Sequence, residues 1–199
     1  MTKVNICILI SGNGSNMLSL VNDIKKKGYA NTSLIISDNN KSIGLQKAKE
    51  LGLKTFILEK SKYRNLPKEF DKHLNKILNQ ENIQLICLAG FMKILTPWFI
   101  RLWENRILNI HPSILPKFKG LNSHKRVIDS GDRKHGCTVH YVNAEIDGGE
   151  ILGQSFVVVL KKDTTTTLAA KVLKKEHALY PKILYKIIVN NKLFLINNT

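Results

Sequence analysis

An amide and an imidazole stand close together in the stretch Leu108–Pro116, which also carries two prolines. We expect a strand over residues 107–109, and strand alternation would place Asn109 and His111 on the same side. Pro112 favours an extended backbone at His111. A stiff loop that holds these two groups at the carboxyl end of a strand is a good support for a catalytic site. A histidine with a purely structural role is the alternative.

A carboxylate that could pair with His111 lies in the turn Asp147-Gly148-Gly149. This turn follows the expected strand that contains His140. A carboxylate beside an imidazole raises the pKa of the histidine and favours the imidazolium form. Asp-Gly is also an ordinary turn signal. Sequence spacing alone does not show that Asp147 reaches His111.

A glycine-rich turn, Ser11–Asn16, separates the first expected strand from the first expected helix. Ligands of open α/β sheets bind beyond the carboxyl ends of the strands, and a helix N-terminus attracts anions. Gly14, Ser15 and Asn16 could therefore hold the phosphate of a mononucleotide or a sugar phosphate. The turn lacks the third glycine of a dinucleotide site and the Gly-Lys-Ser/Thr of a P-loop. A plain structural turn is the other interpretation.

The elements that would position these residues alternate along the first half of the chain. We expect strands at 4–10, 32–37, 54–58, 85–89 and 107–109, and helices at 17–26, 43–51, 68–79 and 97–103. This order predicts a doubly wound, mostly parallel α/β sheet, similar to a Rossmann fold. In the second half we expect a helix at 124–129, strands at 136–141 and 151–160, and a helix at 167–180. Pro181 would kink or restart that last helix before 183–189.

The second half would extend the parallel sheet by an antiparallel strand. Because no Gly/Ser/Pro-rich linker separates the halves, we predict one domain over residues 1–199. Residues 1–109 would form the phosphate-binding half, and residues 110–199 the catalytic half, which carries His111 and Asp147.

Composition narrows the class of protein. The 199 residues carry a net charge of +16, but the lysines are spread along the chain and form no basic tail. An A/T-rich coding bias explains this charge, so we expect no nucleic-acid partner. With no run of about 18 apolar residues, no membrane span is expected. Three scattered cysteines, Cys7, Cys87 and Cys137, predict free thiols in a reducing cytoplasm, and no Cys/His spacing suits a metal.

Five segments together resemble the glycinamide ribonucleotide transformylase family, the folate-dependent formyltransferases of purine synthesis. They are Ile10–Asn16, Leu88–Leu95, Leu108–Ser113, Asp147–Gly149 and Glu176–Pro181, so the resemblance covers nearly the whole chain. It implies that a formyl group moves from 10-formyltetrahydrofolate to the amine of glycinamide ribonucleotide. It also implies small-molecule substrates, no metal, and a monomer or homodimer.

The resemblance further implies roles for single positions. The catalytic trio corresponds to Asn109, His111 and Asp147, and the phosphate-binding turn to Gly14, Ser15 and Asn16. The ribose contact corresponds to Glu176, and the folate pocket to Met92, Lys93, Ile94 and Leu95 together with Asn109. The loop around the pteridine corresponds to residues 142–147, and one further site histidine to His140. His111 would be protonated, with Asp147 keeping it charged and oriented.

Two positions depart from the family pattern. Family members often carry an arginine before the third helix that contacts the folate, but the matching position falls near Pro67. Arg64, slightly upstream, is the substitute that we name. Lys119 stands where a proline is common in the family. Neither change touches the catalytic trio.

Three rivals remain. Methionyl-tRNA formyltransferase shares the fold and the chemistry but normally carries an extra C-terminal domain. Formyltetrahydrofolate deformylase has a similar site and would carry an N-terminal regulatory domain. A nucleic-acid-binding module without catalysis would bind DNA or RNA with a steep salt dependence, but the chain lacks the expected basic motif.

Overall fold

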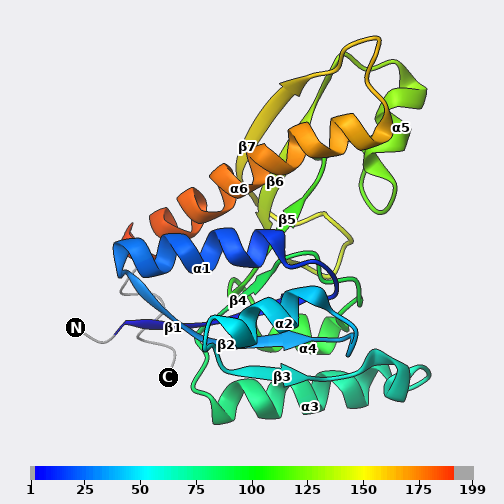
Figure 1. Cartoon of the computed structure of the whole chain (residues 1–199). Helices are drawn as coiled ribbons and strands as arrows, with labels where there is room; N and C mark the ends of the chain where they lie inside the picture. Colours follow the sequence, from blue (N-terminus) through cyan, green and yellow to red (C-terminus); the bar gives the residue numbers. More distant parts are fainter. Residues whose placement is uncertain (1–2, 191–199) are drawn as a thin grey trace.

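The computed structural model of the chain describes residues 3–190. Within that range one sheet runs through both halves, in the order β3-β2-β1-β4-β5-β6-β7 (Figure 1). Its strands are β1 (Val4–Ile10), β2 (Ala30–Ser37), β3 (Thr55–Ile57), β4 (Leu85–Leu88), β5 (Ile107–His111), β6 (Lys134–Tyr141) and β7 (Ile151–Val158). The helices are α1 (Ser15–Lys27), α2 (Ile43–Glu50), η1 (Lys60–Tyr63, a 3-10 turn), α3 (Pro67–Gln80), α4 (Pro97–Leu102), α5 (Ser123–Ser130) and α6 (Thr165–Asn190).

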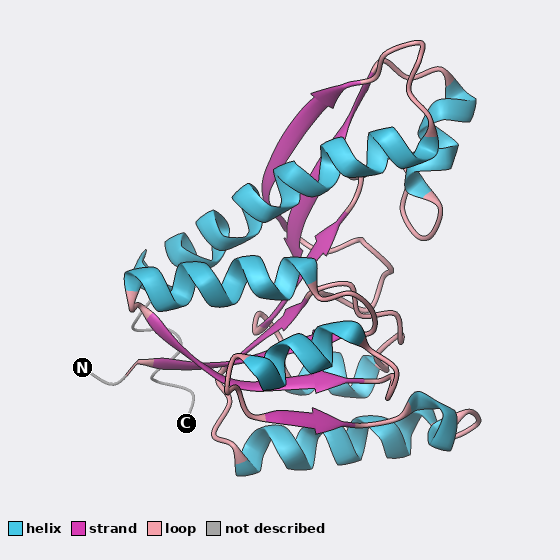
Figure 2. Cartoon of the chain, viewed as in Figure 1, coloured by secondary structure: helices cyan, strands magenta, loops and turns pink. Residues whose placement is uncertain are grey.

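Strands β1 to β5 are parallel, as the alternation predicted. The central strand β1 is apolar except at Asn5, because both of its faces are buried. Residues such as Ile8 pack with α1, α2 and α6 on one face. Residues such as Leu9 pack with α3 and α4 on the other (Figure 2). The carboxyl ends of these strands therefore share one edge, where ligands of such sheets bind.

The antiparallel extension is larger than predicted. Strand β6 pairs antiparallel with β5, and β7 pairs antiparallel with β6, so a hairpin is added where a single strand was expected. Pairing with β6 also lengthens β5 to His111, opposite Thr138. Asn109 and His111 therefore lie within a strand, not in a loop after it. Their common side follows from the strand alternation, as expected.

Helix α6 runs without interruption through Pro181, where a kink or restart was expected. Proline has no N–H group, so the carbonyl of residue 177, four positions earlier, loses its helical donor. The hydroxyl of Ser19, on α1, donates to that His177 carbonyl at 3.3 Å. Pro181 itself is buried. Packing against α1, β6 and β7 thus holds the helix continuous despite the missing bond.

Candidate active site

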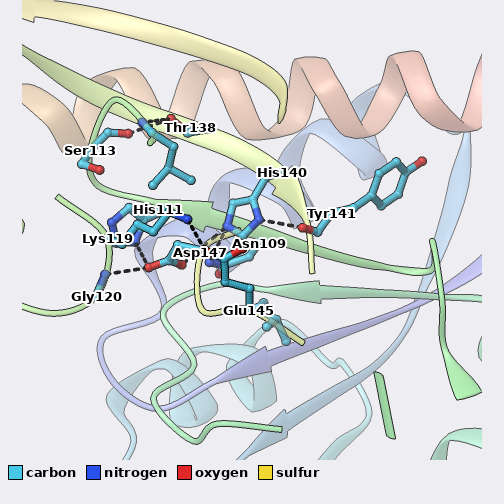
Figure 3. A network of polar contacts seen from close by, with 12 residues as sticks. Asn109, His111, Ser113, Lys119, Gly120, Thr138, His140, Tyr141, Glu145 and Asp147 are labelled. Atoms are coloured by element: carbon cyan, nitrogen blue, oxygen red, sulfur yellow. Dashed lines mark hydrogen bonds and ion pairs between the residues drawn. The ribbon is translucent and has the colours of Figure 1, made fainter. Parts of the chain in front are cut away.

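Asp147 is the centre of a polar cluster at the carboxyl end of β5 (Figure 3). Its Oδ2 atom lies 3.3 Å from His111 Nδ1 and accepts a hydrogen bond of 2.8 Å from the Gly120 N–H. Its Oδ1 atom lies 3.6 Å from His140 Nε2. The side chain is only 10% exposed. The contact that spacing could not establish, between Asp147 and His111, is therefore present.

His111 is held from both sides of its ring. Nδ1 faces Asp147, while Nε2 donates to the Phe118 carbonyl at 3.0 Å. The loop after His111 is fastened to β6, because the Thr138 hydroxyl donates to the Ser113 carbonyl at 2.7 Å. The imidazole is buried, with little freedom to turn.

The pKa of His111 differs from the sequence-based expectation. Burial lowers this pKa below its ordinary value, although the Phe118 carbonyl and the Asp147 carboxylate both act to raise it. His140 and Arg126 add to the lowering. Desolvation and the neighbouring carboxylate thus act in opposite directions on this ring. Asp147 shows the reverse balance: burial favours a higher pKa, but hydrogen bonds from His140 and Gly120, and the charge of His111, leave its pKa below the ordinary value.

His140 orients Asn109. The two residues face each other across β5 and β6, and Asn109 Nδ2 lies 3.2 Å from His140 Nε2. The other ring nitrogen, Nδ1, donates to the Tyr141 carbonyl at 2.7 Å. Its buried ring fixes the amide that would face a substrate.

The turn before α1 is built by close backbone packing. Gly14 has a φ of 72°, and a Cβ there would lie 2.6 Å from the Cα of Gly44. The Gly44 N–H donates to the Gly12 carbonyl at 2.9 Å. The turn leads directly into α1 at Ser15, whose first N–H groups lack helical partners. A helix N-terminus of this kind favours an anion.

Glu176 lies beside this turn, although it comes from the other half of the chain. The Asn16 side chain donates to Glu176 Oε2 at 2.6 Å, across 160 residues. Both side chains are buried. Burial raises the pKa of Glu176, against the hydrogen bond from Asn16. The predicted phosphate and ribose contacts therefore adjoin each other.

The side chains of the segment expected to line the folate pocket differ in their exposure. Met92 and Ile94 are exposed apolar side chains, at 58% and 70%. Leu95 is buried in the core with α3 and α4. Lys93 places its ammonium 4.7 Å from the centre of the Phe70 ring. Arg64 is exposed where η1 ends.

Neither a metal centre nor a membrane span is found in the part of the chain that the structure describes. Over residues 3–190, no group of three or more His, Cys, Asp or Glu side chains could hold a metal ion. No helix in the same range is long and apolar enough to cross a membrane. The three cysteines are buried and free.

Comparison with known proteins decides the family. The sequence matches the family described as "Formyl transferase" over residues 4–184. The chain belongs to the formyl transferase family. Its seven-stranded sheet is the fold of solved family members: the phosphoribosylglycinamide formyltransferase of Brucella melitensis is 41% identical, with a TM-score of 0.89 over 94% of this chain and 96% of that one.

Curated formyl transferase relatives differ in length. The phosphoribosylglycinamide formyltransferase of Escherichia coli is 36% identical over 91% of this chain and 85% of its own length. The trifunctional purine biosynthetic protein adenosine-3 of Gallus gallus is 43% identical over 92% of this chain. The chain spans only 18% of that longer protein.

Some site features of this formyl transferase were not predicted. Gly120 and Phe118 contact Asp147 and His111 through backbone atoms, which leave no side-chain signature. Ser123, the first residue of α5, brings its hydroxyl within 3.5 Å of His111 Nε2. His124 and His135 form a second imidazole pair, with 3.0 Å between Nδ1 and Nε2. A small hydroxyl residue and two scattered histidines carry no motif that would have identified them.

Proposed function

We propose that the chain transfers a formyl group from 10-formyltetrahydrofolate to the amine of glycinamide ribonucleotide, giving formylglycinamide ribonucleotide in purine biosynthesis. The observation that carries this proposal is the contact of Asp147 with His111, at 3.3 Å, beside the Asn109 amide. It occurs in a member of the formyl transferase family. Relatives that cover most of this chain are named phosphoribosylglycinamide formyltransferase.

The proposed chemistry needs an oxyanion site and a proton carrier. The substrate amine attacks the formyl carbon, and the formyl oxygen becomes negative. The Asn109 amide donates to that oxygen and the positive charge of a protonated His111 stabilises it, and loss of one such group typically costs about 100- to 1,000-fold in rate. Negative charge beside His111 raises its pKa, so the imidazolium is favoured as the charge develops. Asp147 takes the proton of the attacking amine and delivers it, directly or through water, to the leaving nitrogen.

The substrates would lie along the edge formed by the carboxyl ends of the strands. Gly14, Ser15 and Asn16 hold the phosphate, since the N-terminus of α1 opens there. Glu176, bound to Asn16, holds the ribose.

The folate packs against the exposed Met92 and Ile94, with residues 142–147 around the pteridine. Arg64 is offered as the contact that replaces the family arginine. Leu95 is buried behind them and supports this wall from the core.

The proposed setting is the cytoplasm, with these small molecules as the partners. Three buried thiols without a disulfide fit a reducing compartment. A monomer or a homodimer stays a prediction, which analytical ultracentrifugation would decide.

A spectrophotometric assay tests the function. Purified protein is mixed with 10-formyltetrahydrofolate, with and without glycinamide ribonucleotide, and folate release is followed. We expect turnover only with the ribonucleotide, lost in His111→Ala and retained in His73→Ala, since His73 is an exposed histidine on α3. Turnover without an acceptor would identify a deformylase instead. Activity only with charged initiator tRNA would identify the other transferase.

A further inference from the structure

Two loops meet over His111. The first joins β5 to α5, and its Phe118 carbonyl accepts from His111 Nε2. The second joins β6 to β7, and its Asp147 faces His111 Nδ1. The orientation and burial of His111 thus depend on how these two loops lie against each other.

Direct contacts between the loops come from neighbouring residues. The Gly120 N–H donates to Asp147 Oδ2 at 2.8 Å, and Lys119 Nζ lies 2.6 Å from Glu145 Oε1. We call these two contacts the loop clasp; Figure 3 shows all four residues. The first contact uses a proposed catalytic carboxylate. The second uses an ion pair that the proposed chemistry does not require.

Both members of the ion pair are held by their own loops. The Glu145 N–H donates to Asn143 Oδ1 at 3.1 Å, and the Glu145 side chain folds over Gly148, where a Cβ would lie 2.5 Å from the carboxylate. On the other loop, the Arg126 guanidinium donates to the Lys119 carbonyl. The pair therefore joins two segments that are already shaped, at a small cost in side-chain freedom.

We propose that Lys119 and Glu145 are positioning residues that close the loop clasp and thereby hold His111 between Phe118 and Asp147. The ammonium is 33% exposed and the carboxylate 67% exposed. An ion pair of that exposure contributes little to the overall free energy of unfolding. Its effect is local: it fixes one loop relative to the other where both touch the same imidazole.

The charged and titratable groups around His111 define what else could move its pKa. They are Asp147, His140, Arg126, His124 and His135. Burial is the largest cause of the lowered pKa of His111. An opened clasp lets water reach the ring, and the pKa of His111 then rises towards its ordinary value.

The first test is kinetic and rests on the proposed formyl transfer. Lys119→Met and Glu145→Gln should each lower kcat about two- to fivefold, with KM for the ribonucleotide unchanged, as fits an exposed ion pair. Lys119→Glu combined with Glu145→Lys should restore kcat. The gap to the unaltered protein should close in about 1 M salt, where the Debye length is about 3 Å. Lys54→Met is the matched control, because Lys54 and Glu81 form an exposed pair of the same 2.6 Å length.

The second test does not depend on catalysis. The pKa of His111 is followed by NMR in protein labelled at its histidine rings. Lys119→Met removes a cation and Glu145→Gln removes an anion, so a through-space charge effect would move this pKa in opposite directions. The clasp predicts an upward shift in both variants and none in Lys54→Met. If the unaltered protein transfers no formyl group, the proposed function fails, and this titration still decides the clasp.

Four outcomes would overturn the inference. Three are opposite shifts in the two variants, no shift in either, and an equal loss of kcat in Lys54→Met. A difference in kcat that persists unchanged at high salt would also reject an ion-pair clasp, because screening must weaken it.

Discussion

The turn before α1 and the surroundings of His111 are built by opposite means. Backbone atoms fix the turn, where Gly14 packs on Gly44 and no side chain need change its charge. Side chains from separate segments fix His111, and the central contact pairs a carboxylate with an imidazole. A segment held by backbone packing keeps its shape whatever the protonation of nearby side chains, whereas contacts between charged side chains respond to pH and salt. The shape of the turn should therefore depend less on pH and salt than the arrangement around His111.

The largest effect is expected at Asp147. Asp147→Asn keeps the size of the side chain but removes the proton acceptor and the charge facing His111. We expect kcat to fall by about 100- to 10,000-fold, the usual contribution of general acid–base catalysis. Steady-state assays, with Asp129→Asn on the exposed face of α5 as the control, measure this loss. Near-normal kcat would place the reactive contact elsewhere.

In the turn before α1, a substitution should act by lowering the stability of the folded protein. Gly14→Ala adds a Cβ that would lie 2.6 Å from the Cα of Gly44, at a φ of 72°. Left-handed strain and overpacking together should lower the free energy of unfolding by roughly 2 to 5 kcal/mol. Gly12→Ala is the matched control, because a Cβ there meets no atom within 4 Å. Denaturant unfolding curves compare the two variants, and equal midpoints would refute the packing argument.

A third prediction concerns the stability of the folded protein at low pH. Burial, with the neighbouring His124, lowers the pKa of His135 from 6.5 to about 4. The folded protein therefore binds this proton less well than the unfolded chain, so stability is full above about pH 6.5 and falls as the pH drops towards about 4. The loss at the acid end is at most about 3 kcal/mol.

Unfolding curves at several pH values check this expectation. His135→Gln should flatten the pH dependence, and His73→Gln, on the exposed part of α3, should not. An unchanged slope in His135→Gln would show that other groups cause the acid sensitivity.

The smallest change in stability is expected at Glu176, a charged side chain that adjoins the turn before α1. Burial raises the pKa of this carboxyl, so its charge costs stability once the pH exceeds its ordinary pKa of 4.5. Glu176→Gln removes that cost, and we expect the free energy of unfolding to change by less than about 1 kcal/mol. KM for the ribonucleotide should rise about tenfold, through loss of a charged hydrogen bond. An unchanged KM would remove Glu176 from the ribose site.

The sequence was most informative where local pattern determines structure. Apolar runs and helix spacing located every strand and α-helix of residues 3–190, because a strand buried on both faces, such as β1, must be largely apolar. The predicted first and last residues of the strands and helices were less accurate. Strand β5 extends to His111 because β6 pairs with it, and such long-range pairing has no local signal.

The site was predictable in its residue types but not in the burial of its side chains. Family motifs named Asp147 and His111, and the structure brings them together. The lowering of the His111 pKa by burial was not expected, because the burial of a ring depends on loops that sequence does not place. Pro181 was misread for a similar reason, since Ser19 supplies the missing donor from another helix.

The hydrogen bond between Asn16 and Glu176 can form only late in the synthesis of the chain. The two residues are 160 positions apart, so at ribosomal speeds of about 5–20 residues per second, roughly 8 to 32 seconds separate their synthesis. During that interval a nascent chain holds the turn before α1 without its carboxylate partner. The proposed ribonucleotide site is therefore completed late in translation, and an interrupted product that ends before α6 would lack Glu176.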